Sequence, residues 1–172
     1  MKKLIPSDPS AAAALGRSPN ATPEQLEAMA ASDLPFLRES AAGHVNTAVS
    51  VLVGLTPDAL RTDEHRRIAG ALASNRNAPS DLLARLCALL DATMLDGSRR
   101  EHFVFRDLAL HLLQHPNCPA DAALAVINRS GRALRLEYAE STTSQVLLAR
   151  LSDDASSSVA AAAQAKVGEH GA

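Results

Sequence analysis

Residues 20–42 form a two-helix unit that the rest of the chain repeats with variations. Thr22 and Pro23 are typical of the start of one helix, and Asp33 and Pro35 of the start of a second. Each predicted helix has one apolar face, formed in turn by Leu26, Met29 and Ala30 and by Phe36, Leu37 and Ala41. Such a helix cannot bury its apolar face alone, but stacked copies can. The sequence therefore predicts a series of stacked helix pairs.

Five units can be placed along the chain, with starts near residues 20, 46, 77, 117 and 142. The second unit is degenerate, whereas the stretches LASNRNAP (72–79) and LLQHPNCP (112–119) match position by position. The fifth unit has Ala160 where an Arg is expected, which is typical of a terminal capping repeat. We expect a flexible arm over residues 1–10, a repeat domain over 11–167 and a flexible tail over 168–172.

The composition indicates an all-α protein. Hydrophobic residues make up 47% of the chain but aromatic residues only 2%, and a core of Ala, Leu and Val suits closely packed helices better than sheets. The basic start lacks the apolar stretch of a signal peptide, and no run of about 18 apolar residues occurs. Two cysteines are too few for a disulfide framework. We expect a cytoplasmic protein with no membrane association.

The repeated pattern N-x-x-P-x-x-L, followed by Asp and then by a hydrophobic-Arg pair, resembles the leucine-rich repeat variant family over roughly residues 15–167. The residues that carry the resemblance are Asn20, Pro23, Leu26, Asp33, Leu37 and Arg38, with the turns at 77–79 and 116–119. The resemblance implies a right-handed solenoid of alternating α- and 3₁₀-helices. HEAT-like repeats, with two α-helices per unit, are the alternative, so the type of the second helix stays open.

The founding example of that family carries an amino-terminal iron-sulfur cluster, which needs four thiolate ligands. This chain has no cysteine before Cys87. We therefore expect neither the cluster nor the redox role that accompanies it, and we predict no cofactor.

The most regular polar feature is an Arg that recurs at Arg38, Arg66, Arg106 and Arg135. The first three of these stand three residues before an Ala. Stacked repeats would align these side chains into a basic stripe that grips an acidic partner. The alternative interpretation is that each Arg pairs with a carboxylate of its own or the next repeat, because charges at repeat junctions normally need pairing. The candidate carboxylates are Asp33 and Glu39 for Arg38, Asp107 for Arg106 and Glu137 for Arg135.

An insertion occupies residues 93–103 of the third unit. Met94, Leu95 and Phe103 are apolar and stand beside Arg99, Arg100 and His102, a mixture that favours a recognition loop over an inert linker. We predict that these last three residues and the four recurrent arginines contact the partner. The alternative is an insertion that binds nothing.

His111, His115 and Cys118 have the spacing of an open zinc site. However, His115 precedes Pro116, which disfavours helix, and His115 and Cys118 match ordinary turn positions of the preceding unit. We therefore predict no metal site.

No catalytic motif occurs, since the chain lacks a Gly-rich phosphate loop, G-x-S-x-G and H-E-x-x-H. His44, His65 and Glu101 are expected to lie on a solvated surface. We predict no catalytic residue; an enzyme would need a site assembled from distant repeats.

The predicted function is a non-catalytic scaffold that binds another protein or peptide. The alternative is a HEAT-like module that binds nucleic acid through the recurrent arginines, since residues 61–135 carry 11 Arg against 8 acidic residues. Against it stand the net charge of −2, the scarcity of Lys away from the termini and the few aromatic side chains for base stacking. An enzyme is the third hypothesis.

The insertion gives the first testable prediction. Deletion of residues 96–101 should leave the melting temperature nearly unchanged but weaken partner binding, because repeat scaffolds tolerate changes in loops on one face. Thermal melts and binding to the co-purified partner measure the two effects. Unfolding of the deletion variant would show that the segment is structural, and unchanged affinity would show that it binds nothing.

Overall fold

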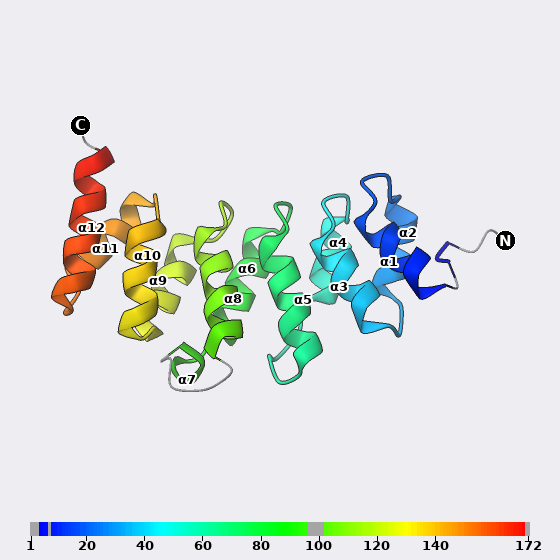
Figure 1. The fold of residues 1–172 in the computed structure, drawn as a ribbon, viewed down its shortest axis with the longest axis horizontal. Coiled ribbons are helices and arrows are strands. Elements are labelled where there is room, and N and C mark those ends of the chain that lie inside the picture. The colour runs from blue at the N-terminus through cyan, green and yellow to red at the C-terminus, as the bar shows by residue number, and fades with distance from the viewer. Residues whose placement is uncertain (1–3, 7, 96–101, 171–172) are drawn as a thin grey trace. The chain divides into compact units, whose positions relative to one another are not determined.

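The computed structural model describes residues 4–6, 8–95 and 102–170, and this part of the chain is all-helical (Figure 1). It contains 12 α-helices, which cover 71% of the described residues, and no strand. The predicted all-α class is confirmed. Within the described residues, no helix is long and apolar enough to cross a membrane.

The chain divides into two compact units, Met1–Leu86 and Cys87–Ala172. The first contains α1 (Pro9–Arg17), α2 (Pro23–Ala30), α3 (Pro35–Gly43), α4 (Val49–Leu55), α5 (Asp63–Ser74) and most of α6 (Ser80–Leu89). The second contains α7 (Ala92–Leu95), α8 (His102–Gln114), α9 (Ala120–Arg129), α10 (Arg132–Ser141), α11 (Gln145–Ser152) and α12 (Ser157–His170). The sequence predicted one continuous domain over 11–167. Contacts between repeats are local, so the periodicity of the sequence does not reveal where the chain divides into compact units.

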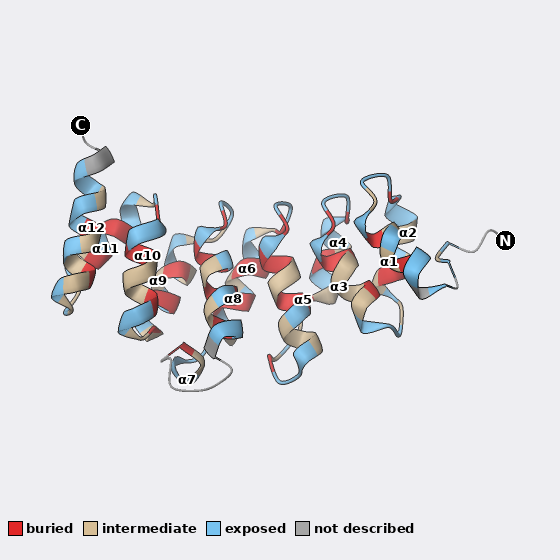
Figure 2. Ribbon diagram, in the orientation of Figure 1, coloured by how far each residue is buried: buried red, intermediate tan, exposed pale blue. Residues whose placement is uncertain are grey.

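In the first unit, α3 is the central helix and packs against α1, α2, α4 and α5. Thr22 fixes the start of α2 through a reciprocal capping box, in which its hydroxyl accepts from the Gln25 backbone N–H and the Gln25 side chain accepts from the Thr22 N–H. The buried side chains between these helices include Leu26, Met29, Leu37 and Ala41. Figure 2 shows the buried stretches of the helices in red. The apolar faces predicted from residues 20–42 therefore form this core.

In the second unit, α12 packs against α10 and α11, while α8 contacts α7, α9 and α10. The buried side chains include Leu134, Leu148 and Val159. Tyr138 of α10 is fully buried, and its hydroxyl donates to the Leu113 carbonyl at 2.7 Å, which satisfies the one polar atom of this side chain.

In chain order, the helices can be grouped into pairs as α2 with α3, α4 with α5, α6 with α8, α9 with α10, and α11 with α12. The second helix of each pair is α, and no 3₁₀-helix occurs in the described residues, so the structure departs from the alternation that the family resemblance implies. At 9 to 14 residues these second helices are long enough for regular i to i−4 bonding. α1 begins inside the predicted arm, and α12 continues past residue 167.

Part of the predicted insertion belongs to helices. Residues 93–95 lie in α7, where Leu95 is fully buried and its carbonyl accepts from the Gly131 N–H at 2.9 Å. Asp91 starts this short helix, because its carboxylate accepts from the backbone N–H groups of Thr93 and Met94 at 2.8 and 3.0 Å. Residues 96–101, which the proposed deletion removes, lie outside the described part of the chain. Phe103 on α8 is 68% exposed.

α1 and α3 approach closely at Gly16. A Cβ atom on Gly16 would lie 2.7 Å from the Ser40 Cβ and 2.8 Å from the Met29 Cε. The Met29 terminus can move, but the Ser40 Cβ is fixed to the α3 backbone, so α1 would have to shift. By contrast, a Cβ on Gly70 in α5 would meet no atom within 4 Å.

These two glycines allow a matched test of the packing. Gly16→Ala should lower the free energy of unfolding by about 1–3 kcal/mol through overpacking. Gly70→Ala should raise it by about 0.5–1 kcal/mol, because alanine favours a helix interior. Urea denaturation followed by circular dichroism measures both. Stabilisation by both substitutions would contradict the close contact between α1 and α3.

Candidate functional site

Among the recurrent arginines, Arg38, Arg106 and Arg135 each pair with a carboxylate of the following two-helix repeat. Arg38 of α3 donates from Nε to Glu64 of α5 at 2.7 Å, and Arg106 of α8 donates from Nε to Glu137 of α10 at 2.7 Å. Arg135 of α10 donates from Nε to Asp154, just before α12, at 2.8 Å. Charge-assisted hydrogen bonds therefore join α3 to α5, α8 to α10, and α10 to the segment just before α12.

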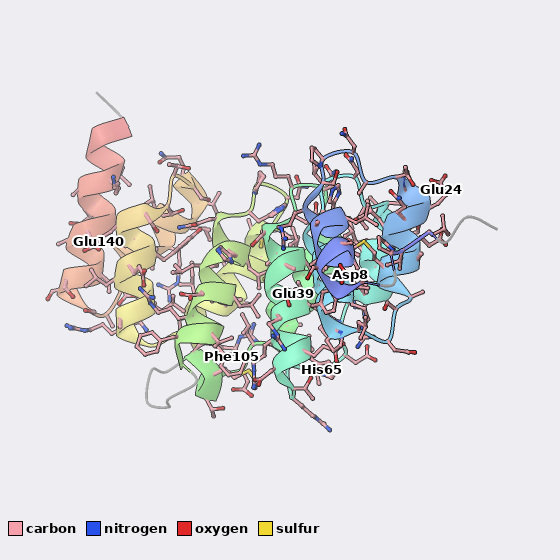
Figure 3. All side chains as sticks on the ribbon, turned by 45° about the vertical axis from the view of Figure 1, so that its right-hand side comes forward. Asp8, Glu24, Glu39, His65, Phe105 and Glu140 are labelled. Carbon is pink, nitrogen blue, oxygen red and sulfur yellow. The ribbon has the colours of Figure 1, made fainter. Side chains whose placement is uncertain are left out.

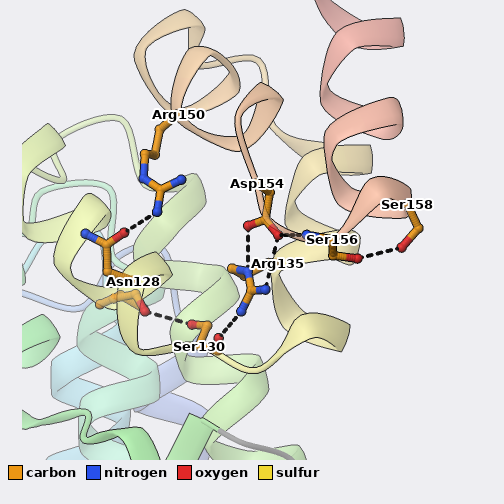
Figure 4. A network of polar contacts seen from close by, with 8 residues as sticks. Asn128, Ser130, Arg135, Arg150, Asp154, Ser156 and Ser158 are labelled. Atoms are coloured by element: carbon orange, nitrogen blue, oxygen red, sulfur yellow. Dashed lines mark hydrogen bonds and ion pairs between the residues drawn. The ribbon is translucent and has the colours of Figure 1, made fainter.

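The same guanidinium groups also bind turns of their own unit. Arg38 donates to the Ser32 carbonyl between α2 and α3, and Arg135 donates to the Ser130 carbonyl between α9 and α10. Figure 4 shows Arg135 between Ser130 and Asp154, and Arg150 bonded to Asn128. Because each of these two guanidinium groups has partners on two sides, Arg38 and Arg135 connect their own two-helix repeat to the following one.

Arg66 pairs with Asp63, three residues earlier on α5, and donates to the Leu60 carbonyl at 3.5 Å. The sequence-based pairing was correct for Arg106 with Asp107, which are 3.4 Å apart.

Two of the predicted pairings were wrong. Glu64 takes the place predicted for Asp33 and Glu39, and Glu137 pairs with Arg106 instead of Arg135. Glu39, labelled in Figure 3, lies 3.8 Å from Arg67. The partners lie on neighbouring helices in space, and proximity in the sequence does not identify them.

The remaining predicted contact residues belong to the insertion. Arg99 and Arg100 lie outside the described residues, and His102 is the first residue of α8.

The five turns before the first helix of each pair share one hydrogen bond. The side chain of the first turn residue accepts the backbone N–H of the third residue. The pairs are Ser18 with Asn20, His44 with Asn46, Asn75 with Asn77, His115 with Asn117, and Thr142 with Ser144, at 3.0 to 3.3 Å. This bond closes each turn in the same shape.

In the first unit, side chains also connect each turn to the one before it. Asn46 and Asn77 donate from Nδ2 to the Pro19 and Val45 carbonyls at 3.0 and 2.6 Å. Asn75, which is 1% exposed, donates to the His44 carbonyl at 3.0 Å. These bonds set the register of successive turns. They satisfy carbonyls that packing would otherwise leave without partners.

His44 is part of this network, so its assignment to a solvated surface was wrong. It is 8% exposed, its Nδ1 accepts from Asn46, and its Nε2 lies 2.9 Å from the Ser18 carbonyl. Both bonds form when Nε2 carries the proton. The signal for this role is the recurrence of Ser, His, Asn, His and Thr at positions 18, 44, 75, 115 and 142.

His115 occupies the same turn position as His44, as the repeat comparison predicted. Its Nδ1 accepts from the Asn117 N–H at 3.0 Å, and the Cys118 N–H donates to its carbonyl at 3.0 Å. His111 is exposed on α8. Metal binding through the His115 Nδ1 would therefore break the turn.

The fifth turn is shorter than the fourth. α9 starts five residues after His115, whereas α11 starts three residues after Thr142. Ser144 also replaces the Asn that the other turns carry. An open groove of about 520 Å³ lies here, lined by Leu113, Gln114, His115, Pro116, Cys118, Ala120, Ala123, Ser141, Thr142, Thr143, Ser144 and Leu147.

The groove combines apolar and hydrogen-bonding groups. Leu113, Ala123 and Leu147 provide apolar surface, and the hydroxyls of residues 141–144 form a polar edge. Among the hydrogen bonds of the described residues, no side chain of the fifth turn donates to the Pro116 carbonyl, although the matching Pro19 and Val45 carbonyls accept from an Asn. The lining includes no Arg, Lys, Asp or Glu. This site is suited to neutral polar and apolar groups.

No protein-family model matches this sequence, and comparisons with curated proteins and with solved structures return no match either. The resemblance to leucine-rich repeat variants therefore remains a prediction.

The Arg135–Asp154 pair gives a pH-dependent prediction. Hydrogen bonds from Arg135 hold the pKa of Asp154 below its ordinary value, against the opposing effect of burial, and the Ser156 N–H adds to the lowering. A carboxylate with a depressed folded-state pKa stabilises the protein above its unfolded pKa, and this contribution is lost as the pH falls through the folded value. Asp154→Asn should lower the free energy of unfolding by about 1–3 kcal/mol at neutral pH.

The difference between wild type and Asp154→Asn should shrink as the pH falls below about 4. Urea midpoints across a pH series measure it. Asp58→Asn is the control, because Asp58 is 98% exposed and lies 3.5 Å from Arg85, so its midpoint should change little. If the difference in urea midpoint between wild type and Asp154→Asn did not change with pH, the effect of the substitution would be due to packing and not to the charge of Asp154.

Proposed function

We propose that this chain is a non-catalytic scaffold, built as a right-handed solenoid of five two-helix units, that binds an extended segment of another protein. The groove between the fourth and fifth turns is the proposed binding site. The observation that carries this proposal is the Pro116 carbonyl, which lacks the Asn donor that the matching Pro19 and Val45 carbonyls have and belongs to a residue that lines the groove.

A peptide supplies what this groove lacks. A backbone N–H or a side-chain amide of the bound segment takes the place of the missing Asn, and small apolar side chains rest on Leu113, Ala123 and Leu147. The hydroxyls of residues 141–144 can donate to peptide carbonyls, because a hydroxyl is both donor and acceptor. The groove volume of about 520 Å³ lies in the range of sites that hold small ligands or short peptide segments.

A second surface supports binding of a protein. Val45, Val49 and Val53 are 56%, 49% and 43% exposed and recur at intervals of four residues along α4 and the turn before it. Val49 and Val53 lie on α4 and share one helix face, whereas Val45 lies in the turn before it. Contiguous exposed apolar side chains often mark protein-binding surfaces.

Nucleic-acid binding is the weaker hypothesis. Arg38, Arg106 and Arg135 have carboxylate partners, so releasing them for phosphate would cost the bonds between units. The lining of the groove carries no positive side chain. An enzyme stays the third hypothesis, since His115 and Cys118 are the ionisable residues of the lining and His115 holds the turn.

The test uses display of random linear peptides on the purified chain. Enriched peptides should bind the wild type and bind Ala120→Glu at least about tenfold more weakly, a loss of about 1.4 kcal/mol. Ala120 is exposed, lines the groove and starts α9, where an acidic residue is favourable, so the fold should persist. Ser80→Glu is the matched control, because Ser80 starts α6 in the same way and does not line the groove.

Peptides that bind Ala120→Glu and wild type equally would place the binding site elsewhere. Tight binding of duplex DNA at physiological salt, together with no enriched peptide and no co-purified protein, would favour the nucleic-acid hypothesis.

A further inference from the structure

The only two cysteines of the chain lie together in the second unit. The Cys87 and Cys118 Sγ atoms are 3.9 Å apart, and both thiols are free. Cys87 is near the end of α6 and is 1% exposed, whereas Cys118 is partly exposed in the fourth turn and lines the groove. Arg129 donates to the Cys87 carbonyl at 3.0 Å and so holds the end of α6 against α9. One thiol is accessible, and the second lies within reach behind it.

We propose that Cys118 and Cys87 are a reactive thiol and a resolving thiol, which hydrogen peroxide converts into a reversible intramolecular disulfide. The distance between the two sulfurs and the difference in their exposure carry this proposal. It does not depend on which partner occupies the groove.

The surroundings assign the two roles. The hydrogen bond from Cys87 lowers the pKa of Cys118, although burial and the nearby Asp121 carboxylate oppose that effect. Cys118 also lies two residues before α9, and the positive end of a helix favours a thiolate. The hydrogen bond to Cys118 and burial raise the pKa of Cys87. Cys118 is thus the thiol that an oxidant meets first, and the one of the two whose thiolate is favoured.

The reaction balances in two steps. The Cys118 thiolate attacks one peroxide oxygen, so the S–O bond forms, the O–O bond breaks, and the departing hydroxide takes a proton to become water. Cys118 is then a sulfenic acid, oxidised by two electrons. The Cys87 sulfur attacks the Cys118 sulfur, the S–S bond forms, and the hydroxyl leaves with the Cys87 proton as a second water. A disulfide has an S–S distance of about 2.05 Å, so rotation about the two side chains must bring each sulfur roughly 1 Å closer.

Peptide mapping of the full chain tests the proposal. The purified chain is treated with hydrogen peroxide, its remaining thiols are alkylated, and it is digested with trypsin without reduction. Trypsin places Cys87 in the fragment 86–99 and Cys118 in the fragment 107–129. We expect these two fragments joined at a mass roughly 2 Da below their sum, and separate again after dithiothreitol. Two alkylated fragments, or disulfides only between chains, would overturn the proposal.

Single variants test the order of reaction. In Cys87→Ser, peroxide should leave a sulfenic acid at Cys118 that dimedone traps. In Cys118→Ser, peroxide should oxidise Cys87 at least about tenfold more slowly than it oxidises Cys118 in Cys87→Ser. Equal rates would overturn the assigned roles. Peptide mapping of the wild type still tests the disulfide proposal if a variant fails to fold.

Discussion

Every helix pair of this protein has an apolar face that only a neighbouring pair can cover, and the rest of the structure depends on this constraint. The side chains that fill the interior are mostly Leu and Ala, and the many alanines let helices approach closely and bring backbone groups near one another. Gly16 shows how close this approach is, because a single added carbon would meet α3. Burial supplies most of the stabilisation, but it is non-directional and cannot fix the register of one pair on the next.

Polar contacts fix that register, and they do so at two levels. At the second helices, guanidinium groups such as those of Arg38 and Arg135 join a turn of their own unit to a carboxylate of the next. At the turns of the first unit, Asn46, Asn75 and Asn77 bond the carbonyls of the preceding turn. Both kinds of bond are directional, so a shifted helix pair would leave buried donors and carbonyls without partners.

The sequence predicted the all-α class and the helix starts over residues 20–42 correctly. Proline and threonine at helix starts, and leucines spaced by three or four residues, reflect local chemistry, so the sequence alone can locate them. The partners of the arginines could not be predicted in the same way. Glu64 and Asp154 are 26 and 19 residues away from their arginines, and their proximity arises only when the helices stack. His44 was misassigned for the same reason, since its role in a turn needs the neighbouring turn.

The sequence did not predict the groove, because the groove arises where the fifth turn lacks residues that the other turns have. Two residues are missing from the fifth turn relative to the fourth, and a Ser stands in place of an Asn. A motif search looks for residues that are present and does not register a shortened turn in an otherwise regular series.

The break in the series also explains why one thiol is accessible. The fourth residue of each turn is Ala21, Thr47, Ala78 and Cys118 in the first four turns. Ala21 and Thr47 are each 3% exposed, and the turn that follows each of them has its full length. Cys118 is followed by the shortened turn, and it remains partly exposed on the groove. The same loss of two residues thus leaves a carbonyl without its usual donor and a thiol within reach of solvent. In the turns over residues 18–79, by contrast, side chains of each turn donate to the carbonyls of the turn before it.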